Sequence, residues 1–166
     1  MNRRSVVLSL ALLPLLAACG FQLRDEAGLP PEMAQTEIVV EDADSLLVRR
    51  VRTLLEPNGV RIVSGQEATA ILEIPTNEPV TSVLTIGDTA RVQEYRVSHT
   101  VQFRLLDAGG REMLSLQTLS QSREISFDDQ RILAASREDE YLRRDLAEDL
   151  ARMLVSRLES VSAEAN

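Results

Sequence analysis

The most regular pattern of apolar and polar positions lies between residues 92 and 106. Apolar or aromatic side chains, with one histidine among them, alternate with charged, amide or hydroxyl side chains from Tyr95 to Leu105. A period of two over this length is typical of a β-strand that buries one face. The segment Val92–Leu106 therefore predicts a long strand with one apolar and one polar face.

The residues that follow predict a hairpin. Asp107-Ala108-Gly109-Gly110 is a turn sequence, and Glu112–Phe127 is the expected partner strand. The apolar phase of this partner strand slips between Leu116 and Leu119. Such a slip indicates a β-bulge, in which one strand carries an extra residue.

A first amphipathic helix is predicted from Ser45 to Glu56. Its apolar residues recur at steps of three and four, and Asp44 is placed to cap its first turn. Pro57-Asn58-Gly59 then ends the helix, because proline and glycine interrupt helical geometry.

A second helix is predicted from Asp128-Asp129, which offers a cap, to about Ser160. Leucines and other apolar residues form a stripe along it. Ser136 and Asp139 have the spacing of a capping box, so we expect the helix to bend or restart there.

Shorter apolar segments predict the remaining strands. These are Thr36–Glu41, Val60–Val63, Ala68–Ile74 and Pro79–Ile86, with a loop at 85–91. The order of elements predicts an α+β fold: a two-layer sandwich of two α-helices packed on one face of a small, mainly antiparallel β-sheet. The other face of the sheet would carry Thr, Ser, Arg, Gln and Glu, and would meet water or a polar partner.

The N-terminus has the pattern of a bacterial lipoprotein leader. Arg3 and Arg4 precede an apolar run that ends at the lipobox Leu16-Ala17-Ala18-Cys19. The run is shorter than the roughly 20 residues that a membrane-spanning helix needs. We therefore predict a signal peptide at 1–18, a lipidated N-terminus and tether at 19–35, and a single α+β domain at 36–166. The alternative is an ordinary signal peptide with a free thiol nearby.

Gly20 indicates where the protein is located, and the net charge limits which classes of partner it can bind. Gly20 stands where an inner-membrane retention signal would have Asp, which favours sorting to the outer membrane, with the domain facing the periplasm. The leader holds only two of the 18 basic residues and none of the 26 acidic ones. The 148 residues that remain therefore have a net charge of −10, which argues against nucleic acid as a partner.

The sequence offers little catalytic chemistry. His99 is the only histidine and lies on the apolar face of the long strand, where a core histidine with one hydrogen bond is the simpler interpretation. With Cys19 lipidated, no thiol nucleophile or second imidazole is left to build a catalytic or metal site. We therefore predict no enzymatic activity, no catalytic residues, no metal and no cofactor.

Arginine is the one residue type that suggests a ligand, and it is the only basic residue in the chain. Arg91, Arg96 and Arg104 lie on or beside the polar face of the long strand, and Arg123 lies on its partner. Adjacent strands could gather these guanidinium groups into a site for a phosphorylated lipid head group. The alternative is cross-strand pairing with Glu94 and Glu124.

The start of the processed chain resembles that of the LptE family of lipopolysaccharide-assembly lipoproteins. The similarity begins with Cys19-Gly20-Phe21-Gln22-Leu23-Arg24 and continues with Leu29-Pro30. It extends through Glu94-Tyr95, then Arg123 with Phe127-Asp128, and then Leu133-Ala134 with Glu140. The element order and the size of the domain agree with it.

The resemblance implies a two-layer sandwich that plugs the LptD outer-membrane β-barrel and helps it to assemble. It implies a role in inserting lipopolysaccharide into the outer leaflet, with lipopolysaccharide itself as a ligand. Arg91, Arg96, Arg123 and Arg137 are then the candidate lipopolysaccharide-binding residues, three of them (Arg91, Arg123 and Arg137) carried over by position. The family requires no cofactor.

Two other functions remain open from the sequence. The chain could be an auxiliary lipoprotein of another envelope lipid-transport system, associated with an inner-membrane transporter or a periplasmic bridge. It could also be a tethered periplasmic hydrolase, although the residues for that chemistry are missing.

Overall fold

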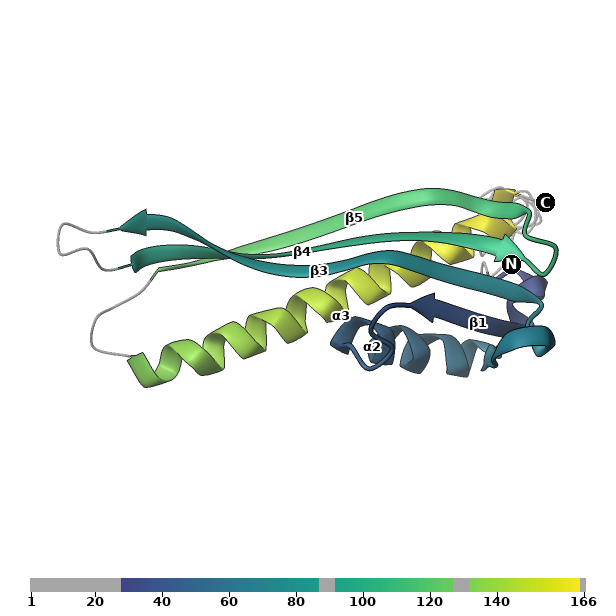
Figure 1. The fold of residues 1–166 in the computed structure, drawn as a ribbon, viewed down its shortest axis with the longest axis horizontal. Coiled ribbons are helices and arrows are strands. Elements are labelled where there is room, and N and C mark those ends of the chain that lie inside the picture. The colour runs from purple at the N-terminus through teal and green to yellow at the C-terminus, as the bar shows by residue number, and fades with distance from the viewer. Residues whose placement is uncertain (1–27, 87–91, 127–131, 165–166) are drawn as a thin grey trace, which may run out of the picture.

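The computed structural model describes residues 28–86, 92–126 and 132–164, with side chains described within 28–86, 94–126 and 138–162. The molecule is elongated, and the start of the described chain and the end of its last helix lie at the same end (Figure 1). Two α-helices, α2 (Leu46–Leu55) and α3 (Ile132–Glu164), accompany one five-stranded sheet.

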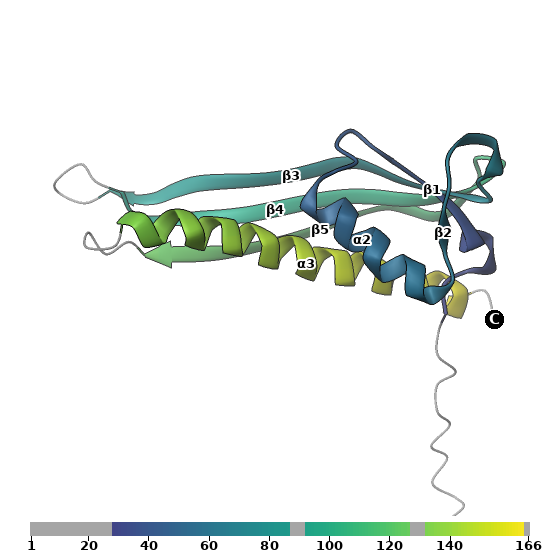
Figure 2. The same ribbon diagram turned by 90° about the horizontal axis from the view of Figure 1, so that it is seen from below.

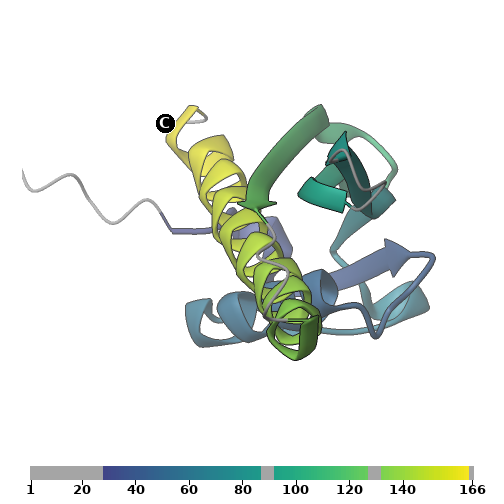
Figure 3. The ribbon, with the colours of Figure 1, turned by 90° about the vertical axis from the view of Figure 1, so that its left-hand side faces the viewer.

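The sheet is mixed, with its long strands antiparallel. Its spatial order is β2-β1-β3-β4-β5; β1 runs parallel to β2 and β3, whereas β3, β4 and β5 are antiparallel neighbours. The strands are β1 (Gln35–Val40), β2 (Arg61–Ile62), β3 (Ala70–Ile86), β4 (Val92–Asp107) and β5 (Glu112–Ser126). The end view in Figure 3 separates the helices from the strands, which confirms the predicted α+β sandwich.

Strand β4 has the alternation that its sequence predicts. The odd-numbered residues from Tyr95 to Leu105 are buried, including Phe103 at 0% exposure, and the even-numbered ones are half-buried or exposed. The helices cover the odd face. The core between the layers therefore follows directly from the period of two.

Helix α2 covers the core with the predicted stripe, of which Val48 and Val51 are fully buried. Its cap differs from the prediction: Ser45, not Asp44, is the N-cap, and the Ser45 hydroxyl accepts a hydrogen bond from the Val48 amide at 3.4 Å. The difference arises because the helix begins at Leu46, one residue later than expected. Gly59, with a φ of 83°, ends the turn that follows.

Helix α3 runs without interruption from Ile132 to Glu164, so the restart predicted at Ser136 is wrong. Further along the helix the apolar stripe is also unbroken: Leu146, Leu150, Leu154 and Leu158 keep a four-residue step, and each is fully buried. Asp139 instead accepts a hydrogen bond from Arg143 one turn later, at 2.7 Å. The predicted cap at Asp128-Asp129 lies outside the described residues.

Strand β3 joins two strands that the sequence separates. The register with β4 shifts between Glu73 and Thr76, so a bulge at Pro75 accommodates the proline without ending the strand. The predicted bulge in β5 is also present, but the shift lies between Leu114 and Gln117. Gln117 takes the first inward position after this bulge, and an amide gives no apolar signal in the sequence.

Candidate functional site

The face of the sheet away from the helices is polar and hydrogen-bonded across the strands. The Thr76 hydroxyl donates to Gln102 Oε1 at 2.9 Å, and Gln102 Nε2 donates to the Thr118 hydroxyl at 3.3 Å. The hydroxyls of Thr100 and Ser120 lie 3.1 Å apart. This polar sheet face, formed by the even-numbered residues of β4 and their neighbours on β3 and β5, confirms the composition predicted for it.

Arg96 lies on the polar sheet face and is paired across the strands. Its Nε and Nη2 atoms donate to Glu124 Oε1 at 3.1 and 2.6 Å. The two side chains remain 43% and 62% exposed. Cross-strand pairing, the alternative considered from the sequence, is therefore what the structure has at Arg96. Because both groups are solvated, the pair is a weak one that another anion can compete with.

Arg104 is the second arginine of this face, and two carboxylates hold it. Its Nε atom donates to Glu73 at 2.6 Å, and its Nη1 atom lies 3.6 Å from Glu112. The hydrogen bond to Glu73 is the main reason that the pKa of Arg104 is raised. Both described arginines of the polar sheet face are therefore already paired.

Arg123 points to the opposite face, so the predicted gathering of Arg96 and Arg123 is wrong. Residues opposite each other on neighbouring strands share a face, and Arg96 is opposite Glu124 while Arg123 is opposite Val97. Arg123 Nη2 instead donates to Asp149 at 2.8 Å and to Asp145 at 3.4 Å. Arg123 thereby joins β5 to α3.

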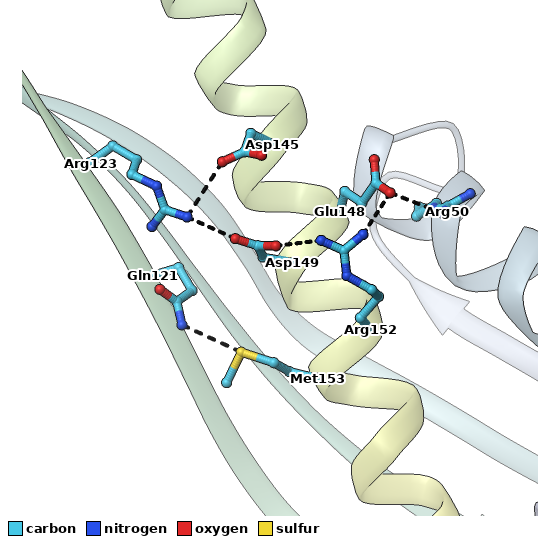
Figure 4. Close-up of polar contacts among 8 residues, drawn as sticks. All are labelled: Arg50, Gln121, Arg123, Asp145, Glu148, Asp149, Arg152 and Met153. Carbon is cyan, nitrogen blue, oxygen red and sulfur yellow. Dashed lines mark hydrogen bonds and ion pairs between the residues drawn. The ribbon is translucent and has the colours of Figure 1, made fainter.

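The ion pairs of Arg123 continue across the helix layer (Figure 4). Asp149 also accepts from Arg152 at 2.5 Å, and Arg152 donates to Glu148 at 2.7 Å. Glu148 accepts in turn from Arg50 on α2 at 3.0 Å. These six residues, called the ion network below, link β5, α3 and α2. They are Arg50, Arg123, Asp145, Glu148, Asp149 and Arg152.

Sequence reasoning did not find the ion network. Asp145 and Asp149 are one helical turn apart, and Glu148 and Arg152 repeat that step, so the helical periodicity was a usable signal. The partners on β5 and α2 could not be identified, since they depend on how the two layers stack.

The other predicted residues lie beyond what the structure describes. Cys19 and Arg91 are outside the described residues, and Arg137 belongs to α3 but its side chain is not described. Lipidation at Cys19 and contacts of Arg91 or Arg137 with lipopolysaccharide therefore remain predictions.

His99 is buried at 5% exposure and has one hydrogen bond, as predicted. Its Nε2 atom lies 2.7 Å from Asn77 Oδ1, and the Asn77 amide donates to the Ser45 hydroxyl at 3.0 Å. Burial, followed by the charge of Arg143, lowers the pKa of His99 below the ordinary 6.5. The imidazole is therefore neutral at pH 7 and ties β4 and β3 to the start of α2.

A cleft of about 530 Å³ lies beside His99, between the start of α2, the bulged part of β3 and helix α3. Its charged residues are four carboxylates and two guanidinium groups: Glu41, Asp42, Asp44, Glu78, Arg49 and Arg143. Among the described residues, no group of three or more His, Cys, Asp or Glu side chains is arranged to hold a metal ion. None of the described helices is long and apolar enough to span a bilayer.

Most of the chain matches a known family and two of its curated members. A family model described as "LptE: Lipopolysaccharide-assembly" matches residues 33–158. The LPS-assembly lipoprotein LptE of Photorhabdus laumondii is 27% identical over 165 residues, which cover 97% of this chain and 88% of that protein. The protein of the same name from Yersinia enterocolitica is 29% identical over 169 residues, covering 98% and 79%.

Solved structures of lipoproteins have the same fold. The solution NMR structure of lipoprotein B from Nitrosomonas europaea has a TM-score of 0.69 and 27% identity, covering 88% of this chain and 92% of that one. The crystal structure of rare lipoprotein B from Shewanella oneidensis has a TM-score of 0.67 and 25% identity, covering 79% and 98%.

Proposed function

The chain belongs to the LptE family of lipopolysaccharide-assembly proteins, and we propose that it is anchored in the outer membrane through Cys19 and plugs an LptD-type β-barrel. The role in lipopolysaccharide transport follows from the family, which is not one of enzymes. The anchor, the barrel partner and direct lipopolysaccharide binding are the proposed parts. The family match over residues 33–158 is the observation that carries the proposal.

The polar sheet face supports a place inside a barrel. Large outer-membrane barrels have a polar lumen. A plug needs a largely polar surface that can lie against such a wall without burying unpaired charges. The cross-strand hydrogen bonds of Thr76, Gln102 and Thr118 and the paired Arg96 meet this requirement. We therefore propose that the polar sheet face meets the barrel wall.

Among the candidate lipopolysaccharide-binding residues, Arg96 has the most suitable described surroundings. A phosphate group could replace the exposed Glu124 as its partner at little cost, because a solvated ion pair contributes only about 0–1 kcal/mol. Arg123 is engaged by two carboxylates and would have to leave both. Arg91 and Arg137 remain in the proposal as positions to test.

Affinity purification from detergent-solubilised outer membranes tests the proposed function. A tagged full-length chain should bring down a large barrel protein in a one-to-one ratio, together with lipopolysaccharide. The Cys19→Ala variant should lose acyl labelling and its place in the outer-membrane fraction. Recovery of an inner-membrane transporter subunit instead of a barrel would favour the auxiliary-lipoprotein alternative.

A further inference from the structure

The outer edge of β3 has no neighbouring strand over much of its length. β1 pairs with β3 only from Ala70 to Ile74, whereas β3 continues to Ile86 with β4 on its other side. Within the described residues nothing pairs with this edge, and Figure 2 shows it running free along one side of the sheet. In an antiparallel strand every second residue then directs its N–H and C=O groups away from the sheet.

Beyond Glu78 and Pro79, this edge carries no charge or proline to protect an exposed strand, and its register shifts lie only on either side of Thr76–Val83. No charged residue occurs from Pro79 to Ile86, and three apolar side chains there are at least half exposed: Val80 at 50%, Val83 at 54% and Ile86 at 64%. Proteins normally place charges or bulges on such an edge to prevent pairing with another chain. Only Pro79 serves that purpose in this stretch before the register shift at Val83.

The opposite edge of the sheet, formed by β5, shows the usual protection. It carries Arg123 and Glu124 and has the bulge between Leu114 and Gln117. Helix α3 also contacts it through the bonds from Arg123. Both strands have register shifts, but only the β5 edge is joined to α3 by ion pairs, so β3 is the edge that is better suited to accept a strand.

The free edge has a defined length. The register between β3 and β4 is regular from Thr76 to Val83 and shifts on either side. Eight residues are enough for one strand of ordinary length. At the Thr76 end the edge opens into the cleft beside His99, where four carboxylates outnumber two guanidinium groups. An incoming strand would thus meet an uncharged stretch and then an acidic end.

The tether of the chain itself is too short to occupy the whole edge. Ser162 donates a hydrogen bond to the Gly28 carbonyl, and Arg143 on the same helix donates to Thr81 of β3. These two helix positions lie about 28 Å apart at 1.5 Å per residue. The eight residues 20–27 span at most about 28 Å, so none would be left to pair with Thr81 or the residues beyond it.

A second copy of the chain is also disfavoured, because each processed chain carries a net charge of −10. Pairing of two β3 edges would bring two acidic molecules, with their acidic clefts, into contact. A partner with basic side chains would gain from the same charges.

We propose that the β3 edge from Thr76 to Val83 binds an extended segment of a different protein as a sixth strand of the sheet. Main-chain hydrogen bonds supply the pairing, as in other cases of strand addition. The segment is uncharged and β-branched opposite Val80 to Val83, and it has Lys or Arg at the end that lies over the acidic cleft. This inference goes beyond the proposed function and does not depend on which protein supplies the strand.

Site-specific photo-crosslinking tests the inference with the full-length chain in living cells. A benzophenone amino acid is placed at Val80, at Ser82, or at the exposed Ser156 of α3 as a control. We expect the probes at positions 80 and 82 to crosslink to the same segment of one partner protein. The two attachment points on that segment should lie two residues apart. The probe at position 156 should not crosslink to that segment. The crosslinked peptides, sequenced by mass spectrometry, should have the composition described above.

Three results would overturn the inference: an adduct with a second copy of this chain, attachment points without a two-residue step, or no protein adduct at all. A barrel protein that crosslinks elsewhere but not at 80 or 82 would leave the proposed function intact and contradict only the inference. Adducts with the two-residue step to a protein that is not a barrel would support strand addition and contradict the proposed barrel partner.

A variant that blocks strand pairing at the β3 edge gives a second test of the inference. Val83→Glu places a carboxylate on the edge and should lower the adduct yield at Ser82 at least tenfold. Ser156→Glu, on the exposed side of α3 and away from the sheet, is the control for the added carboxylate and should leave the yield within twofold. Equal yields for both variants, with unchanged unfolding midpoints, would contradict strand addition.

Discussion

Arg96 and Arg123 lie on adjacent strands of one sheet and have different surroundings. Arg96 faces the polar sheet face and pairs with one carboxylate, whereas Arg123 faces the helices and pairs with two. The two side chains are almost equally exposed, at 43% and 38%. Exposure alone therefore does not separate them, but the connections do. Arg123 joins β5 to α3 within an ion network that reaches α2, whereas Arg96 joins two strands that already share a ladder.

The same contrast holds for the two faces of β4. One face packs against leucines from two helices. The other face carries Thr, Ser and Gln side chains that form hydrogen bonds with one another across the strands. Stability should therefore depend on the helix-facing side, and partner binding on the polar sheet face. The predictions below test that division.

The largest effect is expected in the core. Leu150→Ala removes a fully buried side chain between α3 and the sheet and should lower the free energy of unfolding by about 2–5 kcal/mol. Thr100→Val, on the other face of the same sheet, should change it by less than about 1 kcal/mol. Chemical denaturation of both variants measures the difference, and similar losses would refute the division between faces.

The ion network should contribute less to the free energy of unfolding than the core does, but more than the pair of Arg96 and Glu124 on the polar sheet face. A double-mutant cycle of Arg123→Ala with Asp149→Ala should give a coupling energy of about 1 kcal/mol, because Asp149 is less exposed and is shared with Arg152. The cycle of Arg96→Ala with Glu124→Ala should give a few tenths of a kcal/mol. A larger coupling energy for Arg96 and Glu124 than for Arg123 and Asp149 would contradict the greater contribution of the ion network to stability.

Lipopolysaccharide binding should depend more on Arg96 than on Arg123, which is the opposite of the order expected for stability. Arg96→Glu should weaken binding of purified lipopolysaccharide several-fold with little change in unfolding, since charge reversal repels phosphate at an exposed site. Arg123→Glu should act mainly through lost stability. Surface plasmon resonance and thermal unfolding on the same samples separate the two effects, and unchanged binding by Arg96→Glu would remove Arg96 from the proposed site.

The smallest effect is the pH dependence from His99. Its pKa is lower in the folded protein than the ordinary 6.5, so the unfolded chain binds the proton more readily. The contribution to stability is complete above about pH 6.5 and is lost as the pH falls toward the lower folded value. The stability of the His99→Gln variant should depend less on pH below 6.5, and an unchanged slope in denaturation curves would contradict this origin.

The sequence predicted the elements better than their contacts. The period of two in β4 and the leucine stripe of α3 are set by burial alone, and both were read correctly. The continuity of β3 was missed because the bulge at Pro75 shifts the alternation. The face of Arg123 was missed because it depends on the register between β4 and β5, which the residues of one strand do not specify.

We propose that the polar sheet face meets the barrel and that the helix layer does not. Cys19 is the only cysteine of the chain and is the predicted lipid site, so one introduced thiol can report on one position. Thr100→Cys lies on the polar sheet face, and Ser156→Cys lies on the exposed side of α3. Maleimide labelling should slow at least tenfold at position 100 when the purified chain is in the barrel complex, and less than twofold at position 156. Protection at 156 with free labelling at 100 would contradict the claim.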